Sequence, residues 1–143
     1  MVIYTIGFTG KSAEEFFTTL VRNNVKRLID IRLNNKSQLS GFSNIKHLPY
    51  FLRLHKIEYY YLPEFAPSEE LLSGYKNKTL SWNDYEIIYN KIIKERNILK
   101  NLDRNFIDNS VLLCSEPTAD NCHRRLLAEM IVREYGEIKI RHL

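Results

Sequence analysis

The sequence has few of the features that mark membrane proteins or disulfide-stapled mini-proteins. No uncharged apolar run approaches the roughly 18 residues needed to cross a bilayer, and only two of the 143 residues are cysteine. The first residues include neither a basic segment nor a long apolar one, so the sequence predicts no signal peptide. We therefore expect a cytoplasmic protein without a membrane partner.

The composition is that of an ordinary globular protein. Hydrophobic residues make up 44% of the chain and charged residues 27%, which excludes a disordered tail and a collagen-like repeat. At 143 residues and 17.0 kDa the chain suits one domain, and it contains no internal repeat, low-complexity segment or linker. We expect a single α/β domain over residues 1–143.

The chain is mildly basic. Lysine and arginine number 21 against 17 aspartate and glutamate, a net charge of +4, and the isoelectric point is near 9.0. The basic residues are spread along the chain, whereas dedicated nucleic-acid binders usually concentrate them on one face or in one run. The charge therefore permits nucleic acid as a partner but does not require it.

The spacing of apolar residues alternates along the chain between that of a strand and that of a helix. Strands are predicted at residues 2–6, 27–31, 58–62, 110–114 and 137–141. Helices are predicted at about 12–24, 44–55, 82–104 and 122–135, with a short helix capped by Ser68. This alternation predicts a doubly wound, Rossmann-like, mostly parallel sheet of five strands with helices on both faces, in the order 3-2-1-4-5.

Polar and reactive residues follow the predicted strands. In such sheets a ligand binds beyond the carboxyl ends of the strands, where the strand order reverses. Residues at these ends are Gly7 to Gly10, Asp30, Arg32, Pro63, Glu64, Cys114, Ser115, Glu116, Cys122, His123 and Arg124. Because the carboxyl ends of parallel strands share one edge, we expect these residues to lie together.

The segment CSEPTADNCHRR leads from a strand into a helix. Free backbone N–H groups at a helix N-terminus favour an anion and the thiolate form of a cysteine. Cys122 is thus a candidate nucleophile, Arg124 a clamp for an anion, and His123 an acid, base or orienting group. In the alternative interpretation Asn121 caps the helix, Arg124 pairs with Glu116, and His123 is solvated.

The spacing of these residues excludes several known sites. Arg124 follows Cys114 by ten positions and Cys122 by two. Neither spacing is that of a cysteine-phosphatase loop. No C-x-x-C pair is present, and the two cysteines with His123 fit no zinc knuckle. The turn from Gly7 to Gly10 lacks the third glycine of a dinucleotide site. We expect no metal and no cofactor.

Asp30 and Arg32 project to the same face of their predicted strand. An aspartate there can act in catalysis, pair with a basic side chain or hold a sugar hydroxyl. Alternatively, Asp30, Arg32 and Arg124 form an internal ion pair that orders the site without doing chemistry. Gly7 and Thr9, in the glycine-containing turn, could offer backbone N–H groups to an anion.

The segments TIGFTG, DIR, YLPEFAP and LLCSEPTADNCHRRLLAE are similar to the pattern of domain-of-unknown-function family 488. The resemblance covers nearly the whole chain and implies a compact, intracellular α/β domain of microbial type. It supplies no activity, but it adds Ser37 to the residues of interest. Phe8 stands where the family pattern has a histidine, and Thr9 where it has a serine.

We hypothesise an enzyme, a hydrolase or transferase, acting on a small anionic ligand that resembles a phosphate or nucleotide. Candidate catalytic residues are Cys122, His123, Asp30 and Glu116, and candidate ligand-binding residues are Arg124, Arg32, Gly7, Thr9, Ser37 and Cys114.

Two alternatives stay open. The isoelectric point and the nine tyrosines permit a nucleic-acid-binding or processing domain. A redox-sensitive regulatory module would require Cys114 and Cys122 to form a disulfide, with Cα atoms within roughly 7 Å.

Overall fold

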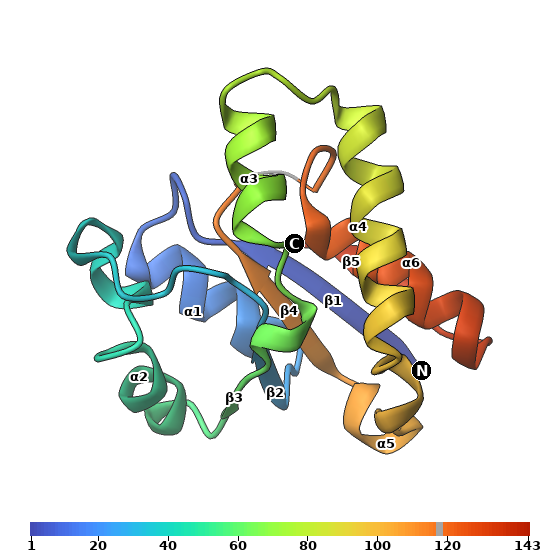
Figure 1. Ribbon diagram of the computed structural model, residues 1–143. Helices are drawn as coiled ribbons and strands as arrows, with labels where there is room; N and C mark the ends of the chain where they lie inside the picture. The colour runs from blue at the N-terminus through green and yellow to red at the C-terminus, as the bar shows by residue number, and fades with distance from the viewer. Residues whose placement is uncertain (117–118) are drawn as a thin grey trace.

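Five parallel strands form one sheet with helices packed around it (Figure 1). The computed structural model describes residues 1–116 and 119–143, and every side chain of that part except those of residues 38–40. The doubly wound α/β class predicted from the sequence is confirmed.

The sheet order is β3-β2-β4-β1-β5. Its strands are β1 (Val2–Gly7), β2 (Arg27–Asp30), β3 (Glu58–Tyr61), β4 (Ser110–Cys114) and β5 (Lys139–His142). The predicted order 3-2-1-4-5 is therefore wrong for the two central strands, because β4 lies between β2 and β1. Every residue of β4 is buried, which suits an apolar strand to the middle of a sheet.

The central position of β4 determines which strand ends meet. In register, Gly7 of β1 stands beside Cys114, and Asp30 of β2 stands beside Leu113. The ends of β1, β2 and β4 therefore meet at one edge, with the cysteine between the glycine and the aspartate.

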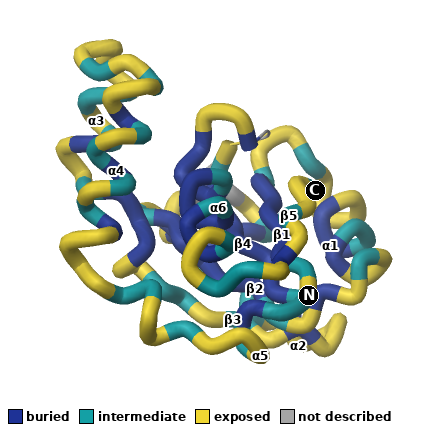
Figure 2. Tube along the Cα trace, turned by 90° about the vertical axis from the view of Figure 1, so that its right-hand side faces the viewer, coloured by how far each residue is buried: buried dark blue, intermediate teal, exposed yellow. Residues whose placement is uncertain are grey.

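Two apolar cores lie on the two faces of the sheet. On one face α1 (Ala13–Arg22) and α2 (Leu48–Leu54) contribute Phe16, Leu20 and Leu52. On the other, α4 (Trp82–Arg96) and α6 (His123–Tyr135) cover the sheet. Figure 2 shows the buried residues concentrated along the three central strands β1, β2 and β4 and along α6.

Helix ends follow local capping chemistry. The Ser12 side chain accepts a hydrogen bond from the backbone of Glu15 at the start of α1, and Ser81 forms a capping box with Asp84 at the start of α4. The helix predicted for residues 82–104 instead ends at Arg96, because Asn97 adopts a left-handed conformation (φ 54°, ψ 42°).

Short elements fill the remaining connections. The helix predicted from residue 44 begins at Leu48. The other short helical segments are η1 (Gln38–Ser43), η2 (Pro63–Phe65), α3 (Glu69–Lys76), η3 (Leu99–Asn101) and α5 (Arg104–Ile107). α3 and the start of α4 stand beyond the carboxyl ends of the strands (Figure 1), so they cover the edge at which the predicted site residues meet.

Gly7 is required by a close backbone approach. A Cβ atom at this position would lie 1.5 Å from the carbonyl oxygen of Glu116 and 2.5 Å from Nη1 of Arg124. Neither neighbour can yield easily, since one is backbone and the other is a buried guanidinium. The strand end and the loop after β4 are thus in direct contact because residue 7 has no side chain.

Replacement Gly7→Ala should reduce the free energy of unfolding by more than about 3 kcal/mol, since overpacking alone costs about 1–3 kcal/mol and here backbone must move. Urea denaturation measures this. Gly74→Ala is the matched control, because its new Cβ would meet the flexible end of Leu80, and it should stay within about 1 kcal/mol of wild type. Equal losses of unfolding free energy in the two variants would contradict the close backbone approach at Gly7.

Candidate functional site

A cavity of about 130 Å³ lies between the strand ends and the α3–α4 pair. Five of the residues predicted for the site line it, namely Arg32, Cys114, Glu116, Cys122 and His123. They come from the segment after β2, the end of β4, the loop that follows and the start of α6. The structure therefore brings these five residues together at one edge of the sheet.

Arg124 lies behind this cavity and is not part of its lining. It is fully buried, and its Nη1 donates to Sγ of Cys114 (3.1 Å) and to the carbonyl oxygen of Glu116 (2.5 Å). Nε donates to Oγ1 of Thr5 on β1 (3.3 Å). Desolvation lowers the pKa of Arg124 to about 10, so the guanidinium still carries its charge at neutral pH.

No carboxylate among the described residues pairs with this guanidinium. The predicted contact with Glu116 exists, but it is made by the backbone carbonyl, while the Glu116 side chain is exposed. The Glu116 carboxylate raises the pKa of Arg124 through space without pairing with it, and nearby groups still respond to the positive charge. Burial first, and Arg124 second, lower the pKa values of Lys11 and His142. The buried guanidinium therefore acts electrostatically on the groups around it.

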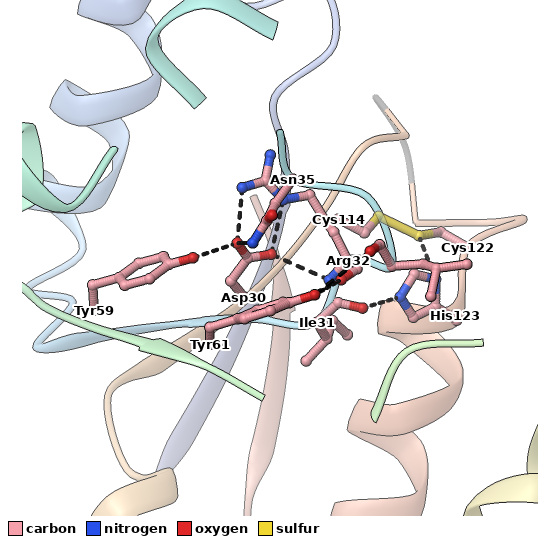
Figure 3. Close-up of polar contacts among 10 residues, drawn as sticks. Asp30, Ile31, Arg32, Asn35, Tyr59, Tyr61, Cys114, Cys122 and His123 are labelled. Atoms are coloured by element: carbon pink, nitrogen blue, oxygen red, sulfur yellow. Dashed lines mark hydrogen bonds and ion pairs between the residues drawn. A yellow bond between two sulfur atoms is a disulfide. The ribbon is translucent and has the colours of Figure 1, made fainter. Parts of the chain in front are cut away.

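Cys114 and Cys122 are bonded as a disulfide on the cavity wall (Figure 3). Cys114 ends β4, and Cys122 is the N-cap residue of α6. Their Cα atoms are 7.5 Å apart, slightly beyond the 7 Å expected, yet the sulfurs meet. The bond was one of the possibilities left open by the sequence.

His123 is held by backbone rather than solvent. Its Nε2 lies 2.8 Å from the carbonyl oxygen of Ile31, and because a carbonyl only accepts, Nε2 carries the proton. The unprotonated Nδ1 then faces Sγ of Cys122 at 3.9 Å. Burial lowers the pKa of His123 to about 4, so the ring is neutral at pH 7 and is not the solvated side chain of the alternative interpretation.

Asp30 is the centre of a buried polar cluster (Figure 3). Its two carboxylate oxygens each accept a 2.8 Å hydrogen bond from the guanidinium of Arg32, and Oδ2 also accepts from Tyr59 (2.6 Å) and Asn35 (3.3 Å). Desolvation, and then Asp30 itself, raise the pKa of Tyr59. The predicted ion pair of Asp30 with Arg32 exists, whereas Arg124 takes no part in it.

The remaining predicted residues lie outside the cavity lining. Gly7 packs against the Glu116 carbonyl, and the backbone N–H of Thr9 donates to the carbonyl of Ser115 (3.2 Å). Ser37 is exposed, and its carbonyl accepts from the side chain of Asn44 (2.8 Å). These residues shape the segments around the site without reaching its interior.

Part of the lining was missed by sequence reasoning. Tyr75, Lys76, Trp82 and Tyr85 reach the cavity from α3 and α4, and the rings of Trp82 and Tyr85 stack with centroids 4.8 Å apart. The spacing of Trp82, Tyr85 and Tyr89 places three aromatic rings on one helix face. That pattern marks a buried face, but nothing in it indicates that the face borders a site.

Metal-binding clusters and bilayer-spanning helices are absent from the described part of the chain. No group of three or more histidine, cysteine, aspartate or glutamate side chains there could hold a metal ion. No described helix is both long and apolar enough to pass through a bilayer.

The fold and the site define an α/β protein in which a strand-end cysteine, a second cysteine and a histidine line one cavity and a buried arginine lies behind it. The chain belongs to the family described as Domain of unknown function DUF488, which matches residues 12–131. The family resemblance noted from the sequence is thus confirmed. No curated protein and no solved structure matches the chain.

The low pKa of His123 has a consequence for stability. The unfolded chain takes up the histidine proton near pH 6.5 and the folded protein near pH 4. Between these values the unfolded state binds more protons, so the free energy of unfolding falls as the pH is lowered. We expect His123 to contribute a loss of about 3 kcal/mol from pH 7 to pH 4.

Denaturation of wild type, His123→Gln and His47→Gln across this range measures the effect. Glutamine can still donate to the Ile31 carbonyl but does not titrate, so His123→Gln should lose less stability on acidification than wild type. His47 is exposed, and its variant should follow wild type. The same pH dependence in all three proteins would contradict the burial of His123.

Proposed function

We propose that the protein is an enzyme, a hydrolase or transferase, that binds a small phosphate- or nucleotide-like anion in the cavity and uses Cys114 as its nucleophile. One observation carries the proposal. The fully buried guanidinium of Arg124 contacts the sulfur of a cysteine that lines a cavity. Arg124 is then a positioning residue that acts through Cys114.

The contacts favour Cys114 over Cys122 as the nucleophile of the reduced protein. A thiolate at Cys114 would accept a charge-assisted hydrogen bond from Arg124 and supply the negative charge that the guanidinium otherwise lacks. Cys122 instead faces His123, whose pKa of about 4 makes it a weak base for a thiol. The sequence-based assignment of the nucleophile to Cys122 is therefore replaced in this proposal.

The surroundings favour an anionic ligand. Lys76 borders the cavity, and the first turn of α6 begins at its wall, where backbone N–H groups lack intrahelical partners. Asn34 and Asn121 add amide groups to the lining. Arg32 contributes little net charge, because Asp30 neutralises it through two hydrogen bonds.

In the proposed reaction the sulfur of Cys114 bonds to the transferred group while the bond to the leaving group breaks. Glu116 is the carboxylate of the described lining, and in this proposal it passes a proton to the leaving group. Water, or a second acceptor in a transferase, then takes the group from sulfur. Asp30 acts as a positioning residue, since its hydrogen bonds hold Arg32 and it does not reach the cavity.

Thermal shift of the reduced protein tests ligand binding. The panel contains phosphate, sulfate, nucleotides, sugar phosphates and short oligonucleotides. A small anion present at 100 times its Kd should add about 2.7 kcal/mol to the stability of wild type. Lys76→Gln should raise the Kd of that anion about tenfold, because one hydrogen bond to a charged group is worth about 1.5 kcal/mol or more.

Lys78→Gln is the matched control, since Lys78 is exposed nearby but is not part of the cavity lining. It should bind as wild type does. Stabilisation by no small anion, or equal weakening in both lysine variants, would contradict the proposal. Stabilisation by oligonucleotides alone would instead favour the nucleic-acid alternative.

A further inference from the structure

We propose that Cys114 and Cys122 form a reversible dithiol–disulfide couple that exchanges with small organic disulfides and thiols through the cavity. The two sulfurs are bonded, and both cysteines line the same cavity. Each residue is almost completely buried, with 1% of Cys114 and 3% of Cys122 exposed. The exchanging reagent must therefore be small enough to enter a space of about 130 Å³.

The two sulfurs have different neighbours, and this difference assigns their roles. Sγ of Cys114 is 3.1 Å from the charged guanidinium of Arg124, whereas Sγ of Cys122 is 3.9 Å from the neutral ring of His123. Cys122 also caps α6, but a helix terminus carries only about half a charge. The full charge in contact with Cys114 makes it the better thiolate, and hence the attacking sulfur.

Oxidation proceeds in two balanced steps. The thiolate of Cys114 attacks one sulfur of a small disulfide RSSR, forms a mixed disulfide and releases RS⁻. The thiol of Cys122 then attacks Sγ of Cys114, the bond between Cys114 and RS breaks, and the Cys122 proton leaves with the second RS group as RSH. The two protein sulfurs are oxidised by two electrons and RSSR is reduced, and small thiols reverse both steps.

Nδ1 of His123 is the polar group that faces the Cys122 sulfur. The proton on Nε2 is engaged with the Ile31 carbonyl, so Nδ1 is left as an acceptor facing the Cys122 sulfur. It can accept a hydrogen bond from the thiol and orient the sulfur toward Cys114 as the new bond forms, while the proton passes to the departing thiolate. His123 is thus a positioning residue for the second step.

Charge favours the open form of the couple. With the disulfide closed, neither sulfur is anionic, and no carboxylate of the described residues pairs with Arg124. Opening the disulfide supplies a thiolate in direct contact with the buried guanidinium. One consequence rests on the proposed function. Formation of the disulfide would remove the Cys114 nucleophile, so oxidising conditions would switch the proposed enzyme activity off.

The probe is 2-hydroxyethyl disulfide, added to reduced protein at pH 7 and quenched with acid before mass measurement. Cys122→Ser should acquire one adduct, on Cys114, more than about tenfold faster than Cys114→Ser acquires one on Cys122, because a free thiol is only a few per cent thiolate at pH 7. Wild type should end as the internal disulfide without an adduct, and 2-mercaptoethanol should return it to the dithiol.

Peptide mapping of wild type at early times keeps the test independent of how the variants fold, and the first adduct should lie on Cys114. A first adduct on Cys122, stable adducts on both cysteines, or unreacted thiols would each overturn the inference. No anionic ligand is present in this experiment. If disulfide exchange fails but an anion stabilises the protein in thermal shift, only the dithiol–disulfide couple is contradicted. If exchange succeeds but no anion stabilises the protein, only the proposed ligand site is contradicted.

Discussion

The buried guanidinium of Arg124 is the contact on which the site depends. Arg124 lies in the first turn of α6 and donates hydrogen bonds to Thr5 of β1, to Cys114 of β4 and to the backbone carbonyl of Glu116 in the loop after β4. Burying a charge is costly unless its hydrogen bonds are satisfied, and here backbone, hydroxyl and sulfur satisfy them in place of a carboxylate. No carboxylate of the described residues forms an ion pair with this guanidinium, which is a condition that favours a thiolate or a bound anion.

The strand order explains why this contact forms. Because β4 lies between β1 and β2, its final residue Cys114 has Gly7 on one side and the Asp30 cluster near the other. The missing side chain of Gly7 leaves room for the Glu116 carbonyl and the guanidinium. The Asp30–Arg32 pair in turn fixes the segment after β2, whose Ile31 carbonyl holds His123. Strand order, close packing and polar contacts therefore act together on one edge of the sheet.

Much of this could be predicted from the sequence, for identifiable reasons. The strands were found because apolar β-branched runs end at polar residues, and the start of α1 because Ser12 and Glu15 form a local cap. The clustering of Cys114, Cys122 and His123 followed from their positions after strands in a parallel sheet. Each of these inferences uses neighbours in the sequence or a general property of parallel sheets.

Other features could not be predicted, because they depend on contacts between distant segments. No local pattern separates the order 3-2-1-4-5 from the observed one, since both give a parallel sheet with the same elements. The burial of Arg124 and His123 depends on β1 and on the Ile31 carbonyl, which their own helix does not specify. Lys76 and Trp82 join the site through the way α3 and α4 stand over the sheet, and the lining they form has no signature in the chain.

The central claim is that Arg124 holds Cys114 as a thiolate beside the cavity, and one titration tests it most directly. The ultraviolet absorbance of the thiolate in reduced Cys122→Ser reports on Cys114 alone as the pH is varied. The account predicts a midpoint at least one pH unit below the value of about 8.5 for a free cysteine. A midpoint at or above that value would contradict it, because the contact with Arg124 would then not favour the charged sulfur.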